Sequence, residues 1–136
     1  MRMEDNEGMP ERAVLIVEDS ENSATTLEVA LAGIPGVAVL TARSGVEALR
    51  ILGGGQGVVA IVTDLNMPRM DGFELIRRVR EHRELAETPI VVVSADTDPE
   101  TPVRVARLGV SAFFPKPYSP GAVRRKLEQI LNGTCM

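Results

Sequence analysis

The sequence has a single cysteine, Cys135, next to its C-terminus. An internal disulfide needs two cysteines, so none can form, and this agrees with the reducing environment of the cytoplasm. Aromatic residues make up only 3% of the chain, no basic run with interleaved aromatic residues occurs, and the net charge is −4. These features argue against a surface that binds nucleic acid directly.

Long apolar segments are also missing. No apolar run approaches the roughly 20 residues that a membrane-spanning helix needs. The N-terminal stretch MRMEDNEGMPER is polar and acidic, and it has the features of neither a signal peptide nor a transit peptide. We therefore expect a cytoplasmic protein that does not contact a membrane.

The chain itself has the size and composition of one soluble domain. Its 136 residues are 44% hydrophobic and 25% charged, the balance of an ordinary globular protein. No internal repeat or low-complexity tract is present. We expect a folded domain at residues 12–132, with a flexible tail at residues 1–11 and another at residues 133–136.

Strand and helix patterns alternate along the chain. Apolar runs predict strands at residues 13–17, 37–42, 58–63, 90–94 and 112–114. Helices are expected to begin at Ser20, Ser44, Asp71, either Asp98-Pro99 or Thr101-Pro102, and Ser119, and the last to end at Gly133. This alternation predicts an α/β fold, a doubly wound five-stranded parallel sheet with helices on both faces.

The composition of the strands predicts their order in the sheet. The first, third and fourth strands are the most apolar and should lie in the middle. Pro115 favours an edge position for the fifth strand, because proline cannot donate a hydrogen bond within a central strand. The predicted order, counting strands along the chain, is 2-1-3-4-5, with the functional site at the carboxyl ends of strands 1 and 3.

Helical periodicity also predicts which side chains face inward. In the helix that begins at Ser44, we expect Val46, Leu49 and Leu52 to face the sheet. The helix near residues 99–108 offers only a thin apolar stripe, formed by Val103, Ala106 and Leu108. A solvated helix face is expected for the arginines that follow Asp71, which are Arg77, Arg78, Arg80 and Arg83.

Charged and polar residues follow the strands at the predicted carboxyl edge. Glu18 and Asp19 follow the first strand, Asp64 the third, Ser94 the fourth and Lys116 the fifth. Two unit charges about 4 Å apart repel by roughly 4 kcal/mol at an effective dielectric of 20. One lysine cannot offset three carboxylates, so a divalent cation that prefers oxygen ligands, such as Mg²⁺, is the natural complement.

Four short motifs carry a resemblance to a known family. The stretches VEDS, TDLNMPRMDG, VSA and FFPKP resemble the receiver domain of two-component response regulators, the CheY-like family. Each motif alone is weak, but all four occur in the family order, and the likeness covers roughly residues 12–132. The resemblance implies a flavodoxin-like (βα)₅ fold and a cis Lys116-Pro117 peptide bond.

The resemblance also implies a chemistry for this site. Asp64 would accept a phosphoryl group from a sensor histidine kinase or a histidine phosphotransfer protein. Glu18, Asp19 and Asp64, with the backbone carbonyl of Asn66, would hold Mg²⁺. Lys116 would pair with the phosphoryl group. Such a domain is not an enzyme in the ordinary sense, because it catalyses only its own phosphorylation and dephosphorylation.

The family also implies a way of signalling. Ser94 would bond the phosphoryl group, and Phe113 would be the switch aromatic, although simple core packing is an equally good reading of Phe113. The surface formed by the helix near residues 99–108, the strand at 112–114 and the last helix would then change. A downstream protein target or a second copy of the chain would read that change.

Two other functions fit parts of the pattern. Phosphatases and phosphotransferases of the haloacid dehalogenase type also use Mg²⁺ and an aspartate that follows a strand. Their motif is Asp-x-Asp, however, and here Asn66 takes the second position. An inactive adaptor would keep the fold without the chemistry, and the intact acidic set argues against it. A stand-alone regulator, a phosphorelay intermediate and an excised receiver of a hybrid kinase all remain open.

Overall fold

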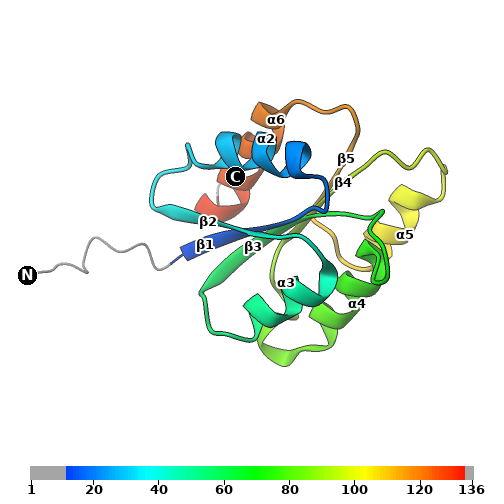
Figure 1. Cartoon of the computed structure of the whole chain (residues 1–136), viewed down its shortest axis with the longest axis horizontal. Coiled ribbons are helices and arrows are strands. Elements are labelled where there is room, and N and C mark those ends of the chain that lie inside the picture. The colour runs from blue at the N-terminus through cyan, green and yellow to red at the C-terminus, as the bar shows by residue number, and fades with distance from the viewer. Residues whose placement is uncertain (1–11, 134–136) are drawn as a thin grey trace, which may run out of the picture.

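A computed structural model describes residues 12–133 as one α/β sandwich (Figure 1). Five parallel strands form a sheet in the order β2-β1-β3-β4-β5. The strands are β1 (Arg12–Val17), β2 (Val37–Ala42), β3 (Val58–Asp64), β4 (Ile90–Ser94) and β5 (Ala112–Pro115). The helices are α2 (Glu21–Leu31), α3 (Gly45–Leu52), α4 (Gly72–Glu81), α5 (Thr101–Arg107) and α6 (Pro120–Asn132), with a short 3₁₀ helix η1 (Arg83–Leu85). The predicted fold class and strand order are confirmed.

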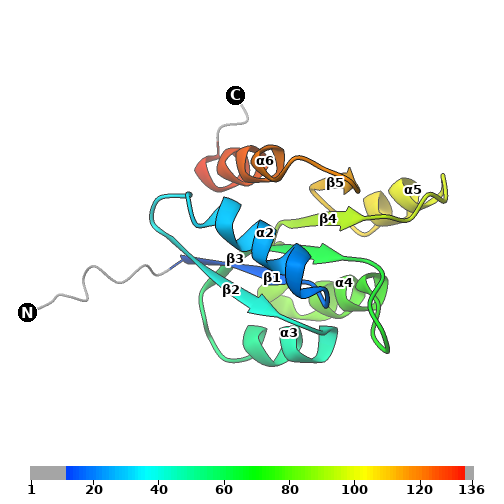
Figure 2. The same cartoon turned by 45° about the horizontal axis from the view of Figure 1, so that its top comes forward.

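Helices cover both faces of the sheet. Figure 2 shows α2 and α6 on one face and α3 and α4 on the other. Successive residues of a strand point to opposite faces. In β1, Val14 and Ile16 therefore pack with α2 and α6, whereas Leu15 and Val17 pack with the α4 side. Burial on both faces explains the uninterrupted apolar run of this strand.

The strand order places the carboxyl ends of β1 and β3 side by side. β1 pairs with β2 on one side and with β3 on the other. The chain connections therefore diverge between β1 and β3, which is where open α/β sheets bind their ligands. Pro115 ends β5 at the exposed edge, as its missing N–H requires.

The expected helix starts are also found. The side chains of Ser20, Ser44, Asp71 and Ser119 each accept a hydrogen bond from a backbone N–H in the first turn of the following helix. The helix after β4 begins at Thr101, the second of the two expected starts, with Pro102 in its first turn. Gly133 ends α6 with a φ of 64°, in the left-handed region. The expected tails lie outside the described residues, apart from Gly133.

Three expectations about helix faces are wrong. Leu49 and Leu52 of α3 pack against the core as expected, but Val46 is 51% exposed, and the smaller Gly45 and Ala48 are buried instead. In α5, Val103 is 43% exposed and Ala106 is also exposed. The buried residues of α5 are Thr101 and Val105. The inward face of this helix is therefore set by a hydroxyl and one valine, and of the expected apolar stripe only Leu108, at the C-cap, packs against the core.

Arg80 is the third exception, because it leaves the solvated face expected for the α4 arginines. Its guanidinium donates four hydrogen bonds of 2.8–3.1 Å to backbone carbonyls. Two of these carbonyls belong to Leu108 and Gly109, at the C-terminal end of α5, and two precede β4. Arg80 thus joins α4 to α5, and burial lowers its pKa from the ordinary arginine value.

Within residues 12–133, no helix is both long and apolar enough to span a bilayer.

Gly72 has no room for a side chain. A Cβ atom there would overlap the backbone carbonyl oxygen of Asp64 and would lie 2.7 Å from the Cα of Leu65. We expect Gly72→Ala to lower the free energy of unfolding by about 2–4 kcal/mol, because backbone atoms must move. Urea denaturation measures this difference.

Gly121→Ala is the matched control. The nearest atom to a Cβ at this position belongs to the flexible side chain of Arg125, at 3.4 Å, and the residue lies in α6. Alanine is a better helix former than glycine, so we expect a change of less than about 1 kcal/mol in either direction. Equal losses for the two variants would contradict the steric explanation.

Candidate functional site

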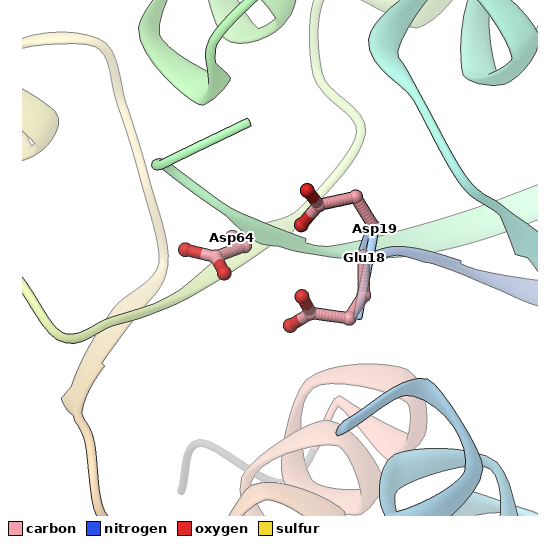
Figure 3. Close-up of side chains that lie close together, drawn as sticks. All are labelled: Glu18, Asp19 and Asp64. Carbon is pink, nitrogen blue, oxygen red and sulfur yellow. The ribbon is translucent and has the colours of Figure 1, made fainter. Parts of the chain in front are cut away.

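Three carboxylates meet at the carboxyl edge of the sheet. Glu18 and Asp19 follow β1, and Asp64 is the last residue of β3 (Figure 3). One carboxylate oxygen from each lies within 4.8 Å of the others. Glu18 and Asp64 are only 1% and 5% exposed, whereas Asp19 is exposed. The group is therefore anchored in the core and open to solvent on the side of Asp19.

Local hydrogen bonds hold the two buried carboxylates in place. The backbone N–H of Glu18 donates to the carbonyl of Ala42, and its side chain accepts from the N–H of Ser20 at 3.1 Å. Asp64 Oδ1 accepts from the N–H of Asn66, also at 3.1 Å. These bonds orient both carboxylates while leaving other lone pairs free to accept a further ligand.

Lys116 reaches both buried carboxylates from the segment after β5. Its Nζ donates to Asp64 Oδ2 at 2.9 Å and to Glu18 Oε1 at 3.2 Å. The backbone N–H of Lys116 also donates to the carbonyl of Ser94, which ties this segment to the end of β4. The Lys116-Pro117 peptide bond is cis, as expected. The structure therefore brings together four of the predicted site residues.

The pKa shifts follow from burial and from the net negative charge. Burial raises the pKa of Glu18 above its ordinary value, the charge of Asp64 raises it further, and the Ser20 N–H and Lys116 act in the opposite direction. Burial alone would lower the pKa of Lys116, but its hydrogen bond to Asp64 and the two negative charges raise it overall. One ammonium therefore faces three carboxylates, and the oxygen-rich group fits a hard divalent cation.

Asn66 and Ser94 bond the cluster only through their backbones, and among the described residues no side-chain hydrogen bond joins Asn66, Ser94 or Phe113 to it. Ser94 is fully buried, and its Oγ accepts from the N–H of Asp96 at 3.0 Å. Asn66 is exposed, and it was predicted to act only through its carbonyl. Phe113 is half-buried on β5 and packs against the core on the α4 side. Each is placed on the edge or strand that the sequence predicted.

Some residues of this region were not identified from the sequence. Gly72 allows the chain to pass close behind Asp64, and its N–H donates to the carbonyl of Leu65. Thr101 is a fully buried polar residue at the start of α5. Tyr118 is half-buried near Lys116, Glu18 and Asp64. Only Gly72 had a usable signal, since a glycine after the helix cap Asp71 is unusual for a first helical position.

Comparison with known proteins agrees with this arrangement. The model of the response regulator receiver domain family matches residues 14–128. The chain belongs to this family. The receiver domain is 31% identical over 118 residues to a chemotaxis protein CheY homolog of Campylobacter jejuni, covering 87% of this chain and 91% of the relative. It is 36% identical over 122 residues to the two-component response regulator ORR3 of Oryza sativa, covering 90% and 92%.

Solved structures show the same fold. A response regulator receiver protein from Pseudomonas putida superposes on the receiver domain with a TM-score of 0.80 at 32% identity, covering 87% of this chain and 96% of that one. The chemotaxis protein CheY4 of Vibrio cholerae gives a TM-score of 0.79 at 29% identity, covering 88% and 98%. The flavodoxin-like (βα)₅ architecture is thus shared along nearly the full length.

Tyr118 provides a spectroscopic test of the electrostatics. It is the only tyrosine, and the chain lacks tryptophan, so its phenolate absorbance can be followed alone. Burial raises the pKa of Tyr118; Lys116 opposes this, and Glu18 and Asp64 add to it. We expect a titration midpoint above the usual value of about 10. Asp64→Asn should lower that midpoint, and an unchanged midpoint would show that the phenol does not sense the site.

The same shifts predict how stability changes at high pH. The folded-state pKa values of Tyr118 and Lys116 both exceed their ordinary values. Above pH ~10 the native state therefore binds more protons than the unfolded chain, and the free energy of unfolding falls as the pH rises. Urea denaturation across this range measures the slope.

Proposed function

We propose that this receiver domain accepts a phosphoryl group on Asp64 from a phosphohistidine of a partner protein. The partner is a sensor histidine kinase or a histidine phosphotransfer protein, as membership of the family implies. The observation that carries the proposal is the environment of Asp64. Its carboxylate is nearly buried, bonded to an ammonium at 2.9 Å and next to two further acids.

The proposed transfer is a single displacement at phosphorus. A carboxylate oxygen of Asp64 forms a new O–P bond while the P–N bond of the phosphohistidine breaks. The electron pair of the P–N bond stays on the imidazole nitrogen, which takes up a proton from solvent. The product is an acyl phosphate, and attack of water on its phosphorus regenerates the carboxylate and releases inorganic phosphate.

The ligands for a metal ion are oxygen atoms, which suits Mg²⁺. Glu18, Asp19 and Asp64 would hold the ion with the backbone carbonyl of Asn66. When bound, Mg²⁺ supplies positive charge that stabilises the oxygens of the transferred group. Lys116 contributes a second positive charge. Because its ammonium already bonds Asp64, it needs only a small shift to pair with a phosphoryl oxygen.

Ser94 and Phe113 would carry the signal away from Asp64. The Ser94 hydroxyl lies at the end of β4, next to the β3 strand that delivers Asp64, and can donate to a phosphoryl oxygen. Its movement would leave space beside β5, into which the half-buried ring of Phe113 could turn. The α5-β5-α6 surface would then change, and a protein target or a second copy would read it.

The competing functions receive little support. A haloacid-dehalogenase-type mechanism requires an acid at the position of Asn66, whose side chain is an exposed amide. An inactive adaptor would not need the acidic cluster and the lysine bonded to it. Turnover of a generic phosphomonoester would favour the first alternative, and failure to take up a phosphoryl group would favour the second.

Acetyl phosphate tests the chemistry without a partner. In the presence of Mg²⁺ we expect the wild-type chain to gain the mass of one phosphoryl group and Asp64→Asn to gain none. Intact-mass spectrometry measures both. Asp98→Asn is a control, because this exposed loop acid lies outside the cluster and should leave uptake unchanged. Equal uptake by wild type and Asp64→Asn would contradict the assignment of Asp64 as the phosphoryl acceptor.

Thermal unfolding tests the metal site. Mg²⁺ that binds only the native state stabilises it by about 1.4 kcal/mol at roughly ten times its Kd. Asp19 is exposed and repelled by two nearby acids. Asp19→Asn should therefore raise the free energy of unfolding of the metal-free protein by about 1 kcal/mol and remove most of the Mg²⁺ effect.

Glu28→Gln is the control for this experiment. Glu28 is an exposed acid on α2 outside the cluster, and its substitution should leave the Mg²⁺ effect intact. If Asp19→Asn instead lowers the melting temperature without metal, some other group holds Asp19, and the repulsion argument is wrong.

A further inference from the structure

Thr101 is a buried polar residue for which the proposed chemistry has no use. It is 0% exposed and is the first residue of α5. Its Oγ1 donates to Asp96 Oδ2 at 3.0 Å, and its N–H donates to the carbonyl of Asp98. A valine has nearly the same shape, so packing alone does not require a hydroxyl here. The bond to Asp96 gives that hydroxyl a specific partner.

Asp96 connects this threonine to Ser94. The Asp96 N–H donates to Ser94 Oγ at 3.0 Å. Its carboxylate accepts from Thr101 through Oδ2 and from the N–H of Asp98 through Oδ1. Two hydrogen bonds, Asp96 to Ser94 and Thr101 to Asp96, therefore lead from the proposed switch hydroxyl to the first turn of α5. We call these three residues the Ser94–Asp96–Thr101 relay.

Few other contacts hold α5. Its buried residues are Thr101 and Val105. The Arg104 guanidinium lies over the ring of Phe73 at 3.9 Å, and Arg80 bonds the carbonyls at the other end of the helix. A helix with so little buried apolar surface belongs to the low-stability part of a fold, where one polar bond can decide its position.

We propose that Thr101 is a positioning residue that makes α5 follow Ser94. The proposal rests on the proposed function, since it concerns what happens when a phosphoryl group on Asp64 engages the Ser94 hydroxyl. A hydroxyl can donate one hydrogen bond and accept another at the same time. Ser94 can therefore donate to the phosphoryl oxygen while it still accepts from Asp96.

Cooperativity strengthens the relay in the phosphorylated state. Donation to a charged oxygen polarises the Ser94 hydroxyl and makes it a better acceptor for the Asp96 N–H. The hydrogen bond from the Asp98 N–H lowers the pKa of Asp96 most, and the bond from the Thr101 hydroxyl lowers it further. This carboxylate therefore stays ionised and keeps accepting both bonds. A shift of Ser94 toward Asp64 then draws the loop at residues 95–100 with it. The first turn of α5 follows through Thr101.

The decisive variant removes only the hydroxyl of Thr101. Thr101→Val should leave beryllofluoride binding at Asp64 and the NMR response of Ser94 intact. It should reduce the shift changes of residues 102–108 to less than about half of those in wild type. Thr101→Ser keeps the hydroxyl and should restore the response. A full α5 response in Thr101→Val overturns the proposal.

Thr97→Val is the matched control. This exposed threonine lies in the same loop, and within residues 12–133 its hydroxyl has no hydrogen-bond partner. The same chemical change should therefore leave the α5 response at the wild-type level. A loss equal to that of Thr101→Val would overturn the proposal, because any change in the loop would then have the same effect.

Asp96→Ala breaks the relay from its other side. If Thr101 acts through Asp96, the double variant should respond no less than either single variant, which is the non-additivity expected of one pathway. Additive losses would overturn the proposal. If Thr101→Val folds poorly, the single variant Asp96→Ala removes the same side-chain bond at a residue that is only half-buried, and a full α5 response in it overturns the proposal.

Hydrogen exchange separates this proposal from the proposed function. In protein without beryllofluoride, the amide of Asp96 should exchange about fivefold faster in Thr101→Val, as the loss of one hydrogen bond predicts. It should be unchanged in Thr101→Ser. If beryllofluoride leaves the NMR spectra of wild type and of every variant unchanged, the phosphoryl-acceptor function fails. The exchange rates alone then show whether Thr101 holds Asp96 and Ser94 together. Equal exchange in Thr101→Val and wild type overturns the relay.

Discussion

The contact of one ammonium with two buried carboxylates is the constraint on which the rest of the site depends. Lys116 lies 2.9 Å from Asp64 and 3.2 Å from Glu18, and Asp19 adds a third negative charge at the solvent side. The charges do not balance. The excess is negative, so a divalent cation is the natural complement, and the proposed phosphoryl group would need the charge of that cation and of Lys116 beside it.

The same strand ends that bring these charges together also connect them to the surface. The carbonyl of Ser94 accepts from the Lys116 backbone, and its hydroxyl accepts from Asp96. β4 thus lies between the acidic cluster and the lightly held helix α5. Because α5 has few buried residues, it is the element at this end of β4 that a small movement of Ser94 would displace most easily.

Local patterns were enough to predict the framework, and they failed where a side chain has a distant partner. The caps at Ser20, Ser44, Asp71 and Ser119 depend on residues within one turn, so the sequence reveals them. Periodicity correctly turned Leu49, Leu52 and Leu108 toward the core. It was wrong for Val46 in α3 and for Val103 and Ala106 in α5, because small or polar residues such as Ala48 and Thr101 take the buried positions.

By itself the sequence determined the alternation of strands and helices, the strand order, and the edge on which the acids and Lys116 lie. Apolar content and the cost of proline in a central strand are properties of each segment alone. Tertiary structure decided which atoms meet. Arg80 bonds carbonyls 28 and 29 residues away, and Lys116 reaches across 98 residues to Glu18. Such bonds form only once the sheet has brought distant segments together, so no local pattern encodes them.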